Sequence, residues 1–105
     1  MTSSALSLMP NDTMKYGIFL APFHDLKENP TQAMQRDMWL LEYLDELGYA
    51  EAWVGEHHSG GFEIISCPEV FIAAAAERTK HIKLGTGVVS LPYHHPFMVA
   101  GRATQ

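Results

Sequence analysis

The chain has 105 residues, a length that gives one small domain with one hydrophobic core. Its 47% hydrophobic and 18% charged residues are typical of a globular protein, and its formal net charge is −5. This negative charge, without a cluster of Lys and Arg, argues against a nucleic-acid partner. The longest apolar run, residues 70–76, is far shorter than the roughly 20 residues that cross a bilayer, so no membrane contact is expected.

Cysteine content and the first residues bear on the location of the protein. The single Cys67 excludes an internal disulfide and a thiolate zinc site, and it favours a reducing, cytoplasmic setting. Residues 1–13 have no basic segment followed by an apolar one, which argues against a secretory signal. We expect residues 1–13 to be a flexible leader and residues 14–105 to be the folded domain.

The first half of the domain is predicted to be strand, helix and strand. Residues 15–23 are apolar and aromatic and end near a proline, which is typical of a buried strand. Asn29 and Pro30 suit a helix start, and the helix is expected to end at Gly48. Its apolar stripe is Met34, Met38, Leu41 and Leu44. The next strand is predicted over residues 50–55, with Trp53 and Val54 buried.

The second half repeats this alternation. A helix is predicted to begin with Ser66 or Cys67 as its cap and to run through Lys80. A strand interrupted by glycines is predicted over residues 82–91, and a further helix begins at His95 and Pro96. The order βαβαβα predicts parallel strands joined by right-handed crossovers. This pattern fits either a doubly wound sheet or part of a (β/α)8 barrel, and both place ligands at the carboxyl ends of the strands.

Those carboxyl ends carry most of the histidine in the chain. The expected rim contains His24, Glu56, His57, His58, His94 and His95. Imidazole can donate, accept or carry a proton near neutral pH, although a loop histidine is often only solvated. His57 and His58 are expected to point to opposite sides, because they are adjacent in extended backbone.

Two common motifs fail here. The histidines lack the spacing of a metal site such as HExxH, so no metal is expected. The glycines of Gly85-Thr86-Gly87 lie inside a predicted strand rather than at the start of a helix, so they do not form a dinucleotide motif. Glycine within a strand instead indicates close approach by another backbone or by a flat ligand.

Several stretches together resemble a known family. The stretches are KYGIFLAPF, DELGYAEAWVGEHH, PEVFIAAAAERTKHIKLGTGVVSLPYHHP and MVAGRATQ. In this order and spacing they resemble the N-terminal part of the bacterial-luciferase-like, flavin-dependent monooxygenases, and most closely the limonene-monooxygenase-like branch. The resemblance covers nearly all of the expected domain.

The resemblance implies a (β/α)8 barrel that binds reduced FMN at its mouth and uses O2 to oxygenate a small apolar organic substrate. It also implies a separate flavin reductase that supplies the reduced FMN. By this resemblance His57 assists the oxygen chemistry, and Glu56 and His58 support or orient it. The flavin ring is expected against the Gly87-Val88 peptide, which is often cis in the family, with Thr86 and Ala21 also at the cofactor. Phe19 and Phe23 would add an apolar wall that excludes water.

The length departs from the family, because such a barrel has about 250 residues. The chain is therefore expected to be a fragment of a larger enzyme, or a homo-oligomer that covers its open sheet edges. As a fragment alone it is expected to bind FMN poorly and to be inactive. Two alternatives remain open at this stage. One is a noncatalytic flavin-binding or self-associating remnant, and the other is a deazaflavin-dependent reductase of the same superfamily.

Overall fold

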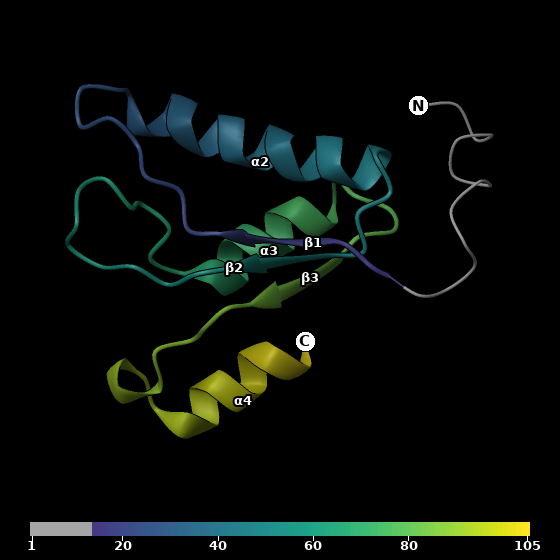
Figure 1. Cartoon of the computed structure of the whole chain (residues 1–105). Helices are drawn as coiled ribbons and strands as arrows, with labels where there is room; N and C mark the ends of the chain where they lie inside the picture. The colour runs from purple at the N-terminus through teal and green to yellow at the C-terminus, as the bar shows by residue number, and fades with distance from the viewer. Residues whose placement is uncertain (1–13) are drawn as a thin grey trace.

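The structure, a computed structural model, describes residues 14–105, and the expected leader lies outside the described residues. Strands and helices alternate along the chain as predicted (Figure 1). They are β1 (Gly17–Leu20), α2 (Pro30–Glu46), β2 (Glu51–Val54), α3 (Pro68–Ala76), β3 (Lys83–Thr86), a short 3-10 helix η1 (Leu91–Tyr93) and α4 (Pro96–Thr104).

The three strands form one parallel sheet in the order β1-β2-β3. The register aligns Phe19 with Trp53 and Trp53 with Gly85. All three strands therefore end at the same edge of the sheet. The loops that follow them gather at the left of Figure 1, which confirms the predicted parallel arrangement.

Local sequence explains the bounds of α2. The Asn29 side chain accepts hydrogen bonds from the N–H groups of Thr31 and Gln32, so the first turn is capped as predicted. Gly48, with φ of 83°, follows the last turn in the left-handed conformation that glycine adopts readily. One face of α2 is buried against the sheet and α3, through Met38, Leu41 and Leu44 among others.

The two faces of the sheet differ in burial. Leu20, Ala52 and Val54 face the helices and belong to the core. The opposite face is open, and Phe19 and Trp53 are 61% and 45% exposed. The predictions that Trp53 is buried and that the first strand is wholly buried are therefore wrong. Side chains alternate along a strand, and only one face of this sheet is covered by helices.

The second predicted helix and the third predicted strand are shorter than expected. α3 ends at Ala76 rather than Lys80, because the N–H groups of residues 80–82 donate to the Asp45 carboxylate at 2.7–2.9 Å instead of continuing a helix. Neither Ser66 nor Cys67 caps α3 with its side chain, although Cys67 occupies the cap position.

β3 ends at Thr86, where its pairing with β2 ends. Residues 87–91 were predicted as strand, but residues 87–90 form a loop and Leu91 begins η1. The Ser90 N–H in this loop donates to the side chain of Glu56. A side chain therefore takes the place of the hydrogen bond that a neighbouring strand would provide. The predicted start of α4 is confirmed, and the His95 ring accepts from the Phe97 N–H as its cap.

Candidate functional site

The loops after β2 and β3 are joined by one buried carboxylate, that of Glu56. Its oxygens accept hydrogen bonds from His58 Nε2 at 2.6 Å, His94 Nε2 at 2.8 Å and the Ser90 N–H at 2.8 Å. The side chain has no exposed surface. Burial by itself would raise the pKa of Glu56, but the hydrogen bonds from His58, Ser90 and His94 outweigh it and lower the pKa to about 2. Glu56 is therefore ionised at neutral pH.

The ionised Glu56 determines how the two histidines are protonated. A carboxylate only accepts, so both rings carry a proton on Nε2 and present Nδ1 on their other side. The side chain of His58 is 40% exposed and that of His94 is 23% exposed. The His58 ring also meets the Tyr93 ring edge to face, with centroids 5.4 Å apart. This cluster fixes the shape of the loops at the strand ends.

His57 points away from this cluster, which confirms that the adjacent histidines face different sides. Its Nδ1 lies 3.1 Å from Glu63 Oε2 in the loop between β2 and α3. Its Nε2 is buried and has no hydrogen-bond partner. A Cβ on Gly55 would stand 2.8 Å from this Nε2 and 3.5 Å from the Gly87 carbonyl oxygen. His57 and Gly87 therefore both lie close to Gly55, at the same end of the sheet.

Gly87 lies against the aromatic side chains of the open sheet face. A Cβ there would be 3.0 Å from Trp53 Cβ and 3.3 Å from Phe19 Cε2, so any side chain would press into these residues. The Gly87-Val88 peptide is cis, as the family resemblance led us to expect. Val88 is 66% exposed and Ala21 is half-buried. The strand ends thus offer a flat, apolar surface beside the free nitrogen of His57.

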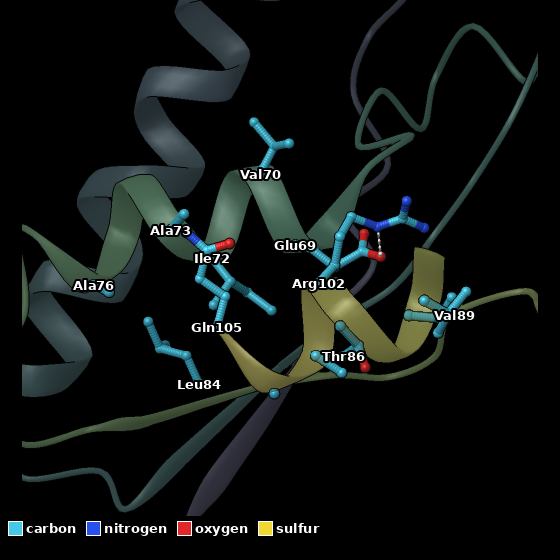
Figure 2. Close-up of a pocket in the computed structure, with 13 residues that line it drawn as sticks. Glu69, Val70, Ile72, Ala73, Ala76, Leu84, Thr86, Val89, Arg102 and Gln105 are labelled. Atoms are coloured by element: carbon cyan, nitrogen blue, oxygen red, sulfur yellow. Dashed lines mark hydrogen bonds and ion pairs between the residues drawn. The ribbon is translucent and has the colours of Figure 1, made fainter. Parts of the chain in front are cut away.

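Thr86 lies on the other side of the sheet. It lines a cleft of about 680 Å³ between α3, β3 and α4, together with Ile72, Leu84 and Val89 among others (Figure 2). Arg102 of α4 donates to Glu69 of α3 at 3.2 Å at this cleft. The side chain of Thr86 is therefore separated from Phe19 and Trp53, and contact with a ligand on the open face would come from its backbone.

His24 has a partner that the sequence did not reveal. Its Nε2 is 2.8 Å from Asp37 Oδ2 of α2, and both side chains are buried. Its Nδ1 is 3.2 Å from the Phe62 carbonyl oxygen, which also accepts from the His24 N–H at 2.8 Å. Phe62 in turn stacks on Phe23 with centroids 4.9 Å apart. His24 thus ties the loops after β1 and β2 to α2, and the expected rim divides into separate groups.

Asp37 was missed because nothing near it in the chain marks it. It occupies a buried position within the apolar stripe of α2, beside Met38. A polar residue at such a position is a signal that a buried partner is needed. Burial raises the pKa of Asp37, although the hydrogen bond from His24 acts in the opposite direction.

Two searches of residues 14–105 gave no candidates. No group of three or more His, Cys, Asp or Glu side chains among them is arranged to hold a metal ion. None of the helices in this range has the length and apolar character needed to span a membrane.

Comparison with known proteins gives the family. Residues 14–105 match the family model described as luciferase-like monooxygenase. The chain belongs to this family. Its sequence is 62% identical over 94 residues to 4-hydroxyprotoasukamycin monooxygenase of Streptomyces nodosus subsp. asukaensis, covering 90% of this chain and 25% of that protein. It is 61% identical over 87 residues to limonene 1,2-monooxygenase of Rhodococcus erythropolis, covering 83% and 22%. The likeness to the limonene-monooxygenase branch is thereby confirmed.

A solved structure of the luciferase-like family supports the architecture. The oxygenating constituent of 3,6-diketocamphane monooxygenase from Pseudomonas putida, in complex with FMN, matches with a TM-score of 0.81 and 30% identity, over 86% of this chain and 25% of that chain. The alternating strands and helices of this chain therefore belong to a (β/α)8 barrel rather than to a doubly wound sheet. The chain spans about a quarter of the length of these relatives.

The residues at the strand ends suit the ring of a flavin. A flat ring can lie where Gly87 has no side chain, beside Phe19 and Trp53, while the His57 ring is buried next to Gly55 at the same end of the sheet. Gly87, Val88 and Ala21 would hold the ring. These assignments remain predictions.

Proposed function

We propose that the chain is part of an FMN-dependent monooxygenase that uses reduced FMN and O2 to oxygenate a small apolar organic substrate. The observation that carries the proposal is that His57, with its unpaired Nε2, and the Gly87-Val88 peptide lie at the same end of the sheet, both close to Gly55. Membership of the luciferase-like family supports the same reaction class.

Each residue has a distinct part in this proposal. Bound reduced FMN would supply the two electrons with which one oxygen atom of O2 enters the substrate and the other leaves as water. The backbone of Thr86, Gly87 and Val88, with Ala21, supports the ring. His57 holds or accepts a proton at Nε2 beside the ring. Glu56 and His58 act as positioning residues, because their contact fixes the loop that carries His57.

The exposed apolar side chains favour an apolar substrate. Phe19, Phe23 and Val88 are 61%, 76% and 66% exposed near the strand ends, where they would exclude water from the reacting groups. Two relatives are named for limonene and for 2,5-diketocamphane. We propose a small apolar substrate for this chain.

The proposal includes a separate flavin reductase as the source of reduced FMN and a homo-oligomeric assembly. An exposed, stacked aromatic pair on α2, Trp39 and Tyr43, offers a surface for self-association. A cytoplasmic setting suits the free thiol of Cys67. Sedimentation of the wild-type chain against a Trp39→Ala variant would test the assembly, because an unchanged mass distribution would argue against this surface.

The flavin part is tested by titrating the full chain with photoreduced FMN under anaerobic conditions, then admitting air. In an assembled, active preparation we expect saturable binding, and with limonene as the probe substrate we expect an oxygenated product by mass spectrometry; the isolated fragment is expected to bind FMN weakly and to give no product. His57→Ala should retain flavin binding while more of the O2 consumed appears as hydrogen peroxide. Glu77→Gln is a matched control, because Glu77 is exposed on the far end of α3.

The outcomes separate the alternatives. Flavin binding with complete conversion of O2 to hydrogen peroxide would favour the noncatalytic remnant. Binding of a deazaflavin in preference to FMN would favour the reductase. A His57→Ala variant with the wild-type ratio of product to peroxide would refute the role given to His57.

A further inference from the structure

Three histidines at the carboxyl ends of β2 and β3 are divided between two carboxylates. His58 and His94 share Glu56, whereas His57 contacts Glu63. Among the residues that the structure describes, Glu63 is the charged side chain in contact with His57. The side chain of Glu63 is 15% exposed, so it is largely withdrawn from water.

We propose that Glu63 is a positioning residue for His57, which keeps the proton of the neutral imidazole on Nδ1 and leaves Nε2 as a bare acceptor facing the Gly55 and Gly87 corner. This inference deepens the proposed function, on which its importance for catalysis rests. The geometry that supports it is the 3.1 Å contact between His57 Nδ1 and Glu63 Oε2.

The loop after β2 holds Glu63 in place. The His57 N–H donates to the Ile65 carbonyl oxygen at 3.0 Å, which closes residues 57–65 into a compact loop. Ser59 and Gly61 have positive φ values of 59° and 74°, and they turn the chain back towards β2. Next to Glu63, the Phe62 carbonyl accepts from the His24 N–H at 2.8 Å. The backbone on both sides of Glu63 is therefore anchored.

The chemistry of the contact selects one tautomer. An ionised carboxylate can only accept, so a proton on Nδ1, 3.1 Å from Glu63 Oε2, is favoured over one on the other nitrogen. In a neutral ring the other nitrogen then has a free lone pair. That nitrogen is the Nε2 atom, which is buried and lacks a partner in the protein. A buried acceptor without a partner is unfavourable, so a water or ligand group that reached Nε2 and donated to it would stabilise this tautomer.

Glu63 is the carboxylate placed to orient the His57 ring, because it lies beside Nδ1. Glu56 does not perform this task, because its oxygens already accept from His58, His94 and Ser90. Glu63 therefore acts through His57, not by contact with the reacting atoms.

The test is the tautomer of His57, measured by long-range proton–nitrogen correlation NMR on the full chain labelled with 15N-histidine, without flavin. Spectra are recorded at a pH well above the ordinary imidazole pKa of about 6.5, where the ring is neutral. His57→Asn assigns the signal. We expect the wild type to show the Nδ1–H tautomer of His57 and the Nε2–H tautomers of His58 and His94.

Two variants separate positioning from a structural effect. Glu63→Ala removes the acceptor, so the His57 signals should lose the Nδ1–H preference and move towards Nε2–H. Glu63→Gln keeps an acceptor oxygen and should restore the wild-type tautomer. Unchanged signals of His58 and His94 show that the fold is intact, and Glu77→Gln serves as the control. A Glu63→Ala variant with the wild-type His57 tautomer, or a wild type already protonated on Nε2, would overturn the proposal.

This measurement is independent of the flavin titration. If the tautomer responds to Glu63 but no flavin binds, the proposed function fails and the role of Glu63 towards His57 stands. If flavin binds and the His57 tautomer does not change when Glu63 is replaced, the proposed function stands and the role of Glu63 fails. In an active preparation, Glu63→Ala should lower product per O2 consumed several-fold, and Glu63→Gln should recover most of it.

Discussion

Replacing Glu56 by glutamine should destabilise the protein in a way that depends on pH. The mutation leaves the volume unchanged but removes the charge that three donors surround. Because the pKa of Glu56 is lowered from 4.5 to about 2, ionised Glu56 stabilises the folded state. At about 1.4 kcal/mol per pH unit, this contribution is roughly 3 kcal/mol.

The sign follows from the direction of the pKa change. A lowered pKa gives stability that is fully present above the unfolded value of 4.5 and is lost as pH falls towards about 2. Between about pH 5.5 and pH 3.5 the wild type should lose roughly 1.3 kcal/mol of its advantage over Glu56→Gln. Urea unfolding followed by circular dichroism measures this difference, with Glu77→Gln as the exposed control. A difference between wild type and variant that stays constant across this range would refute the reasoning.

Three further substitutions probe other parts of the structure. Gly87→Ala should weaken flavin binding at least several-fold in a fluorescence titration while the fold is retained, because its Cβ would stand 3.0 Å from Trp53 Cβ; wild-type affinity would contradict this. Asp37→Asn should cost less stability at neutral pH than at acidic pH in urea unfolding. The raised pKa of Asp37 means that its carboxyl stabilises the fold below pH 3.8, and that this stabilisation declines as pH rises through the folded pKa. A variant that lost more stability at neutral pH would contradict this account. Asp45→Ala should lower the free energy of unfolding by roughly 1–3 kcal/mol, because three backbone N–H groups lose their acceptor; an unchanged urea midpoint would show that water replaces the carboxylate.

Periodicity was sufficient to predict the order of elements and the parallel sheet. Asn29, Pro30 and Gly48 marked the ends of α2 because caps and left-handed residues are local requirements. The ends of α3 and β3 could not be predicted in the same way. They are set by Asp45 and Glu56, which lie far away in the chain and take up backbone N–H groups.

The sequence predicted where the candidate site lies but not how its side chains pair. Strand order alone brings residues 24, 56–58 and 94 to one edge of the sheet. The pairing of these residues depends on loop conformation, which no periodic pattern encodes. Thus Asp37 showed only that it needed a buried partner, and the sequence named neither Asp37 as the partner of His24 nor Glu63 as that of His57.

The indole of Trp53 occupies the space that a side chain at position 85 would need, since a Cβ on Gly85 would stand 2.8 Å from Trp53 Cζ3. Substitution at one of these positions is therefore constrained by the other during divergence. We expect homologous sequences to covary at this pair, with a larger residue at position 85 appearing only where position 53 has become smaller. Within the family, the space between β2 and β3 on this face of the sheet would then be set by positions 53 and 85 together, not by either one alone.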